Sequence, residues 1–334
     1  MIAHGRNEAH PPFICTSGHA LSAAAALVPL VRNIEAIMTL KNIGMIGIPD
    51  SAGSSFDHGA FDPATRRVFV AHTGRSRVEV IDHDAGKHIA TLSDFPQAAG
   101  VVAGDGAVLV TNRGAASMAW LDARSLETVA VFKTGPRPNG VAIVPRHGLA
   151  IVASIGDETQ RPRFEVLNRD GPQHTINLPG QPRWCVTDAT GGRVFLAIRE
   201  PSMIFVARLP GLDEEEHWNV PAAGAHGLDI DHARGRLYAA CDAGVLVELD
   251  IDTGAVGGRW QLAGAPDVTF FNPATGLVHV AIGEPGLIQT IDPRTGSSSQ
   301  TMTGLRAHTT AIVPPDRLYV FSPPHCGALD FMGA

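Results

Sequence analysis

The chain has 334 residues, of which 44% are hydrophobic and 18% are charged, and it contains 36 glycines and 24 prolines. This composition indicates a globular protein with a large core and many strands and turns. The formal net charge of −7, without any basic run, argues against nucleic acid or an anionic membrane surface as a partner, because neutralising phosphates requires clustered Lys and Arg.

The N-terminal residues carry an apolar stretch, "HALSAAAALVPLV", at residues 19–31. It lies far from the start, lacks a clean basic beginning and a small-residue cleavage signal, and is too short to span a membrane. We therefore expect residues 1–37 to be a disordered or dispensable extension, and 38–334 to form a single domain. Cytoplasmic localisation follows, with a periplasmic or secreted location as the alternative if residues 1–33 act as a signal.

The next feature along the chain is a repeat of 40 to 45 residues. Its second strand is recognisable seven times, for example as "RRVFVAH" and "GRLYAAC", beginning at Arg66, Gly106, His147, Gly192, Gly235, Gly276 and Asp316. The period is typical of a four-stranded propeller blade. In "FDPATRRVFVAHTGRSRVEVIDHDAGKHIATL", residues 61–92, β-branched and apolar runs alternate with turn signals at "DPATR", "TGRS" and "DAG", which predicts four strands. The fold class is therefore all-β: a seven-bladed β-propeller of antiparallel four-stranded blades.

The two ends of the repetitive region are incomplete in complementary ways. The last unit stops after a third strand at "GALDFMGA", whereas residues 33–50 resemble a fourth strand with no blade of their own. We expect this N-terminal strand to close the last blade, which would leave no unpaired sheet edge at the seam.

The repeat resembles YVTN-type propellers, whose blades share D-P, strand, turn, V-x-V-I-D, x-x-T-G and strand. The resemblance covers the chain from about residue 40 and implies the fold, since many such propellers are binding or surface proteins. A looser similarity, carried by "RPNG" at residues 137–140, is to the senescence-marker/gluconolactonase propellers. Those have six blades and a divalent metal in the central channel, and their leading E-G-P is "DHG" at residues 57–59 here. This second resemblance implies metal-dependent hydrolysis of a lactone or ester.

Polar residues recur just before each first strand, where they should ring one mouth of the central channel. Counting back from the second-strand anchors gives Asp57, Gln97 or Ala98, Asn139, Arg183, His226, Asp267 and His308. His58 is included beside Asp57 because only one of the two side chains can point inward. Carboxylates, imidazoles and an amide oxygen would suit calcium, zinc or manganese, so the predicted metal ligands are Asp57, His58, Asn139, His226, Asp267 and His308.

Residues around the ends of the second strands should reach the same face. With Arg183 and Trp184, which would suit a carboxylate beside an apolar ring, these form the predicted ligand-binding set: His72, Asn112, Glu200, Asp242 and Glu284. Ser154 and His325 occupy similar positions. No catalytic residue is assigned.

Three functions remain open: binding of a small molecule or divalent metal at the channel mouth, metal-dependent lactonase- or esterase-type hydrolysis, and a non-catalytic protein-interaction scaffold. Among cofactors we expect at most a divalent metal. A nucleotide is disfavoured because the Gly-rich stretches have no following helix, and covalent haem because C-x-x-C-H is absent. Cys15, Cys185, Cys241 and Cys326 show no metal-finger spacing. The expected partner is a small molecule or a protein, and the expected state is a monomer.

Overall fold

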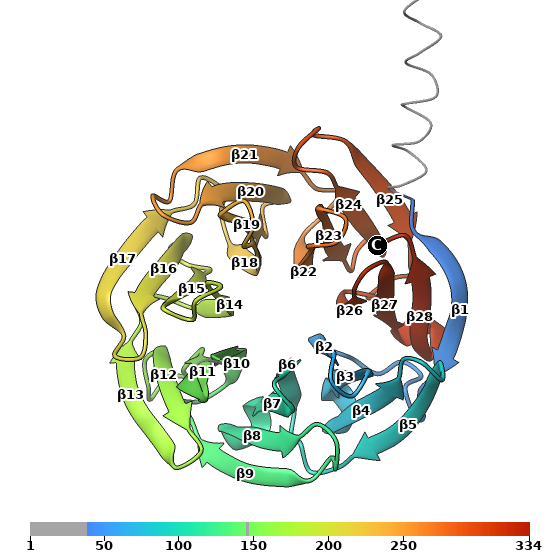
Figure 1. Cartoon of the computed structure of the whole chain (residues 1–334), viewed down its shortest axis with the longest axis horizontal. Coiled ribbons are helices and arrows are strands. Elements are labelled where there is room, and N and C mark those ends of the chain that lie inside the picture. Colours follow the sequence, from blue (N-terminus) through green and yellow to red (C-terminus); the bar gives the residue numbers. More distant parts are fainter. Residues whose placement is uncertain (1–38, 145–146) are drawn as a thin grey trace, which may run out of the picture. The chain divides into compact units, whose positions relative to one another are not determined.

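The computed structural model describes residues 39–144 and 147–334. Within residues 38–334 the chain forms seven four-stranded antiparallel sheets arranged as blades around a channel (Figure 1). The first strand of each blade contacts the first strands of both neighbouring blades, and β2 also contacts β26, so the circle is closed. The sequence prediction of a seven-bladed propeller is confirmed. The predicted extension at 1–37, with its possible signal, lies outside the described residues.

Blades are numbered in chain order. Blade 1 contains β2 (Gly59–Asp62), β3 (Arg67–His72), β4 (Arg77–Asp82) and β5 (Lys87–Leu92). Blade 2 contains β6 (Ala98–Gly104), β7 (Ala107–Asn112), β8 (Ser117–Asp122) and β9 (Thr128–Lys133). Blade 3 contains β10 (Pro138–Val144), β11 (Leu149–Ser154), β12 (Arg163–Asn168) and β13 (Gly171–Asn177).

Blade 4 contains β14 (Pro182–Thr187), β15 (Arg193–Ile198), β16 (Met203–Arg208) and β17 (Asp213–Asn219). Blade 5 contains β18 (Ala225–Asp231), β19 (Arg236–Cys241), β20 (Val245–Asp250) and β21 (Val256–Gln261). Blade 6 contains β22 (Pro266–Asn272), β23 (Leu277–Ile282), β24 (Leu287–Ile291) and β25 (Ser298–Met302). Blade 7 contains β26 (Thr309–Val313), β27 (Arg317–Ser322) and β28 (Gly327–Met332), followed in space by β1 (Lys41–Gly47).

The seam of the propeller lies in blade 7. Strand β1 pairs antiparallel with β28, from Lys41 opposite Met332 to Gly47 opposite Gly327. The predicted closure by an N-terminal strand is therefore confirmed. Without β1, the edge of β28 would present unpaired backbone groups to solvent.

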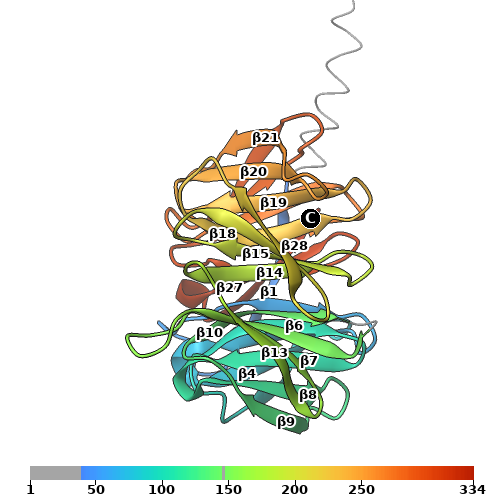
Figure 2. The same ribbon diagram turned by 90° about the vertical axis from the view of Figure 1, so that its left-hand side faces the viewer.

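The core lies between blades, because the middle strands have neighbours on both faces. Strands β7, β11 and β23 are buried along their whole length, whereas outer strands such as β25 alternate between exposed and half-buried residues. The side view in Figure 2 shows how the twist of the blades sets the outer strand β13 obliquely to strands behind it. None of the helices in the described residues is long and apolar enough to cross a membrane.

Turn chemistry explains the regular repeat. In blade 1 the Asp62 carboxylate accepts hydrogen bonds from the backbone N–H and the hydroxyl of Thr65, closing the turn between β2 and β3. In blade 5 the Asp250 carboxylate binds Thr253 in the same way, and Gly254 follows at φ +68°. Asp begins these turns because its short side chain bonds the backbone ahead of it, and Gly supplies positive φ without strain.

Candidate functional site: a polar ring and an apolar chamber in one channel

Most first strands begin with a β-bulge, and several of the predicted channel residues lie in those bulges. The pairing with the second strand is interrupted between Pro138 and Gly140, between Pro182 and Cys185, between Ala225 and Gly227, and between Pro266 and Thr269. These interruptions contain Asn139, Arg183 with Trp184, His226, and Asp267. A bulge leaves its extra residue out of the ladder and redirects the side chain, which accounts for a polar residue at the same place in successive blades.

One half of the channel mouth is a chain of ion pairs from blade 4 to blade 7. Arg199 Nε lies 2.5 Å from Asp242 Oδ2, and His226 Nδ1 lies 2.8 Å from Asp242 Oδ1. On its other nitrogen, His226 Nε2 is 3.6 Å from Asp267 Oδ1. Asp267 Oδ2 is 2.7 Å from His308 Nδ1. Residues 82 positions apart in sequence are thereby brought together, as the sequence predicted for His226, Asp267 and His308.

The other half of the mouth is centred on Asp57. Its Oδ1 lies 2.6 Å from Nδ1 of His58, and its Oδ2 lies 2.9 Å from the guanidinium of Arg113. Arg113 also donates to the side-chain oxygen of Asn139. Together these nine residues form what we call the mouth ring: Asp57, Arg113, Asn139, Arg183, Arg199, His226, Asp242, Asp267 and His308.

The ring fixes the protonation of its members. Burial opposes ionisation of Asp57, but Arg113 and His58 hold the pKa of its carboxyl well below the usual range. Burial also opposes ionisation of Asp242 and Asp267, whose pKa values are lowered by His226 with Arg199 and by His308 with His226, respectively. Burial disfavours the charged imidazole of His308, yet Asp267 and Asp57 raise its pKa above the ordinary value. Near neutral pH the ring therefore holds three carboxylates, and His308 is biased toward its cationic form.

Arg183 differs from the other cations of the ring. It is half-buried, and in residues 39–144 and 147–334 its side chain makes no ion pair or hydrogen bond, with a buried Nε that has no partner. Burial, together with Arg199 and Arg113, lowers the pKa of its guanidinium, while Asp242 and Asp267 act in the opposite direction. The three ring carboxylates are already paired with other cations, so Arg183 is the ring arginine that has no carboxylate partner among the described residues.

Immediately inside the ring, two aromatic rings meet across the channel. His58 precedes β2 in blade 1 and Trp184 belongs to β14 in blade 4, and their ring planes stack at 3.7 Å between centroids and 5°. These blades are not neighbours. Both residues are buried, with 5% and 8% exposure. We call this pair the plug, because its two rings stack between blades that lie on different sides of the channel.

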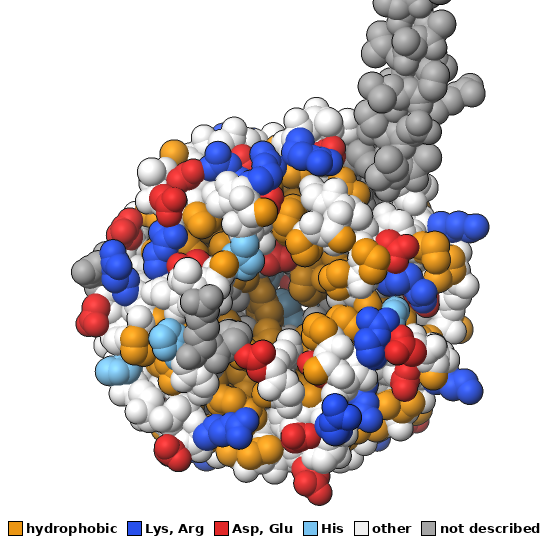
Figure 3. All heavy atoms as spheres, viewed as in Figure 1, with side chains coloured by type: hydrophobic (Ala, Val, Ile, Leu, Met, Phe, Trp, Pro, Cys, Tyr) orange, Lys and Arg blue, Asp and Glu red, His pale blue; other side chains and the backbone are white. Residues whose placement is uncertain are grey.

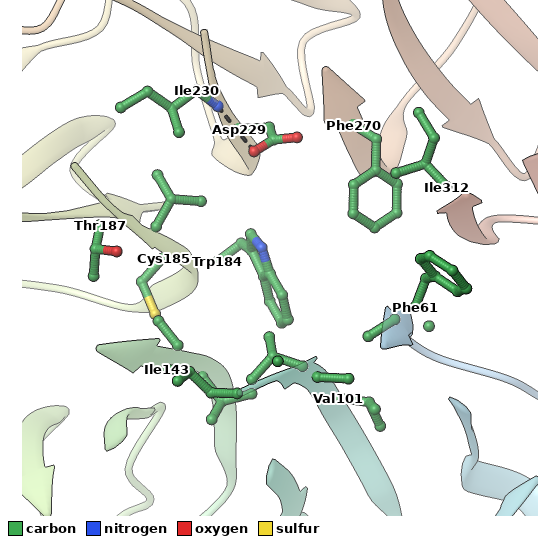
Figure 4. A pocket seen from close by; sticks show the side chains of 18 of the residues that line it. Phe61, Val101, Ile143, Trp184, Cys185, Thr187, Asp229, Ile230, Phe270 and Ile312 are labelled. Atoms are coloured by element: carbon green, nitrogen blue, oxygen red, sulfur yellow. Dashed lines mark hydrogen bonds between the residues drawn. The ribbon is translucent and has the colours of Figure 1, made fainter. Parts of the chain in front are cut away.

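Trp184 also lines an apolar cavity of about 460 Å³, called here the chamber. Figure 4 shows Trp184 at its centre with Phe61, Phe270 and Ile312 facing it from other blades. The hollow at the middle of the propeller, bordered by hydrophobic side chains, is visible in Figure 3. The volume lies within the range of small-molecule pockets.

Asp229 of β18 is the acidic residue among the described residues lining the chamber. Its Oδ1 accepts the backbone N–H of Ile230 at 2.9 Å, and its Oδ2 accepts that of Phe271 at 2.7 Å. Burial raises the pKa of this carboxyl to about 7, although both backbone hydrogen bonds act in the opposite direction. Sequence reasoning did not find it, because "LDID" reads as an ordinary end of a strand before its turn.

The residues predicted at the second-strand ends divide into three groups. His72 is fully buried inside blade 1, 2.7 Å from Glu79, and Asn112 is buried beside Ser117. Glu200 and Glu284 are exposed in loops. Asp242 alone of these predicted residues joins the ring.

Arg113 and Arg199 were not predicted from the sequence, but a consistent choice of the residue that directly follows each second strand would have identified them. Strands β7, β15 and β19 end at Asn112, Ile198 and Cys241, and the very next residues are Arg113, Arg199 and Asp242. The last residue of each second strand points into the blade, so the residue after it reaches the mouth. Because side chains alternate along a strand, selecting Asn112 and Glu200 was a displacement of one position.

The small residue after several ring members is required by packing. A Cβ on Gly140 would lie 2.3 Å from the carbonyl oxygen of Arg183, and one on Gly227 would lie 2.4 Å from that of Asp267. In each case the glycine lets the bulge of the next blade approach. The "NG" and "HG" pairs in the sequence therefore have a structural cause that does not involve a metal.

The six predicted metal ligands are at or beside the mouth, but they contact one another and arginines instead of converging on a point. In the part of the chain that the structure describes, no group of three or more His, Cys, Asp and Glu side chains is placed to hold a metal ion. As arranged, these donors do not fit a divalent cation, and the metal site stays a sequence-based prediction.

Comparison with known proteins supports the fold alone. No protein-family model and no curated protein sequence matches the chain. Among solved structures, Kuenenia stuttgartiensis hydrazine synthase superposes with a TM-score of 0.73 at 13% identity, over 85% of this chain and 96% of that one. Streptogramin B lyase superposes with a TM-score of 0.73 at 12% identity, over 88% of this chain and 97% of that one. The chain is thus a seven-bladed β-propeller, and its function has to be argued from its own channel.

Proposed function

We propose that this propeller binds a small organic carboxylate at the mouth ring, with Arg183 as the residue that pairs with the ligand. The observation that carries the proposal is the guanidinium of Arg183, which is half-buried and unpaired among the described residues while every ring carboxylate has a cationic partner. An arginine in this state favours a planar anion that can accept two hydrogen bonds.

The other members of the ring suit the body of such a ligand. Asn139 offers an amide, and His308 offers an imidazole whose Nδ1 is held by Asp267. These groups can donate hydrogen bonds to hydroxyl or carbonyl oxygens beside the carboxylate. A hydroxy acid is therefore the ligand class that uses both the cation and the polar groups.

Metal-dependent hydrolysis of a lactone or ester has no comparable support, because the three carboxylates of the mouth ring are occupied by ion pairs. The YVTN-type and gluconolactonase-type resemblances likewise remain expectations from sequence. Elemental analysis of the purified protein would settle the metal directly, since a stoichiometric ion that stabilises the fold would favour the hydrolase function over the one proposed here.

The experiment is calorimetric titration of the protein with malate and with gluconate at pH 7. We expect binding by the native protein and a loss of affinity of about tenfold or more in Arg183→Gln, because a hydrogen bond to a charged group contributes about 1.5–3 kcal/mol. Arg161→Gln is the matched control, since Arg161 is exposed and its side chain makes no hydrogen bond or ion pair with the other described residues. Equal affinities in the two variants would reject Arg183 as the anion-binding residue.

The pH dependence provides a second readout. The raised pKa of His308 favours positive charge in the ring. As the pH rises through that pKa, the charge is lost, so we expect carboxylate affinity to fall in a titration series that runs from neutral to alkaline pH. An affinity that is constant over this range would show that the charge of His308 does not contribute to ligand binding.

A further inference from the structure

The chamber beyond the plug has a different chemistry from the ring and is independent of the proposed function. Its described walls are mainly aromatic and aliphatic, from Phe61, Val101, Ile143, Trp184, Phe270 and Ile312. These side chains come from the first strands of six different blades (Figure 4). Burying the apolar part of a ligand against such walls is favourable by about 25 cal/mol per Å².

Within these walls the Asp229 carboxylate is an isolated acceptor. Each of its oxygens receives one backbone N–H, so each retains capacity for a further donor. In residues 39–144 and 147–334 no ion pair involves Asp229. A carboxylate in apolar surroundings is costly unless a donor or a cation satisfies it.

The other titratable groups bordering the chamber do not supply that cation. His232 is exposed at the rim, and burial lowers the pKa of its imidazole despite the opposing effect of Asp188 and Asp231. Cys185 faces the chamber from β14, where burial raises the pKa of its thiol. At neutral pH both side chains are uncharged, which leaves a ligand as the source of positive charge.

From this placement we propose that the chamber is a second binding site, which takes a hydrophobic ammonium ion: the apolar body lies among the aromatic walls and the ammonium group pairs with the carboxylate of Asp229. The volume of about 460 Å³ accommodates an arylalkyl amine. None of the described residues that line the chamber belongs to the mouth ring, so the two ligands need not compete.

Binding is coupled to a proton. Without ligand, the Asp229 carboxyl titrates near pH 7, and an ammonium ion binds only the ionised form. The competent fraction is therefore about tenfold smaller at pH 6 than at pH 8, and the apparent affinity falls by the same factor.

The test is calorimetric titration of the full chain with 2-phenylethylammonium and with its neutral isostere 2-phenylethanol, at pH 6 and pH 8. We expect the ammonium ion to bind at least tenfold more tightly than the alcohol at pH 8, and to lose about tenfold on going to pH 6. The alcohol should show little pH dependence.

Two variants test whether the preference for the ammonium ion depends on Asp229. Asp229→Asn should abolish the preference for the ammonium ion, whereas Asp94→Asn, which neutralises an exposed loop acid, should retain it. The comparison of the two ligands in the native protein does not depend on the folding of any variant. Equal binding of amine and alcohol at pH 8, a preference that persists in Asp229→Asn, or no detectable binding of either ligand would overturn the proposal.

Discussion

The acidic residues of the mouth ring and the acidic residue of the chamber lie in opposite electrostatic environments. At the mouth ring, acids are surrounded by arginines and histidines, and the pKa values of Asp57, Asp242 and Asp267 are lowered. In the chamber, the partners of Asp229 among the described residues are two backbone N–H groups, and its pKa is raised to about 7. All four residues are Asp, so the difference shows that burial and the partners available at each place in the channel set the pKa of the carboxyl.

Sequence could predict the ring because its signal repeats once per blade. Six of its nine members lie at a nearly constant distance before a second strand with a strong apolar pattern, and several of these lie in a recurring β-bulge. The other three, Arg113, Arg199 and Asp242, directly follow second strands. The chamber has no such signal. Phe61, Asp229 and Phe270 lie inside strands whose alternation is ordinary, and only closure of the circle brings them together.

The stacking of the two rings of the plug could not be predicted from the sequence either. His58 and Trp184 are 126 positions apart, in blades that do not touch through their strands, and nothing in either local sequence indicates that their rings stack. By contrast the seam could be foreseen, because a missing fourth strand at one end matched a surplus strand at the other.

The largest effect is expected from removing the seam, on which both regions depend. A chain beginning at residue 51 lacks β1 and exposes the edge of β28. We expect it to be insoluble or to lack a cooperative thermal transition, whereas a chain beginning at Met38 should unfold cooperatively. A truncation from residue 51 that melts like the full chain would show that β1 is dispensable.

The next largest effect is expected from a change in backbone packing at the ring, which leaves the ring side chains in place. Gly140→Ala places a Cβ against the Arg183 carbonyl oxygen, where the gap is 2.3 Å. We expect a destabilisation of about 1–3 kcal/mol in chemical denaturation. Gly104→Ala, in the chamber wall with its nearest atom at 4.0 Å, is the matched control and should be nearly neutral. Equal stability of the two variants would show that the close approach between bulges does not require glycine at position 140.

The smallest effect is on the pH dependence of stability, and its sign differs between the two regions. Asp57 has a lowered pKa in the fold, so its contribution is present above its ordinary pKa and is lost as the pH falls through the folded value. Asp229 has a raised pKa, so the folded state binds its proton more tightly and stability falls as the pH rises from about 4 to 7.

The check is urea denaturation from pH 3 to pH 8. Asp57→Asn should flatten the acid side of the stability profile, and Asp229→Asn should flatten the decline toward neutral pH. Because Asp229 is only half-buried, the second change should be on the order of 1–2 kcal/mol. A profile in which both variants alter the same pH range would contradict the contrast between ring and chamber.

A crossed titration tests whether one channel holds an anion site and a separate cation site. Native protein, Arg183→Gln and Asp229→Asn are each titrated with malate and with 2-phenylethylammonium at pH 8. We expect each variant to lose affinity for one ligand and keep it for the other, and saturation with malate to leave the binding of the amine unchanged. Loss of both ligands in either variant, or competition between the two ligands in the native protein, would contradict this expectation.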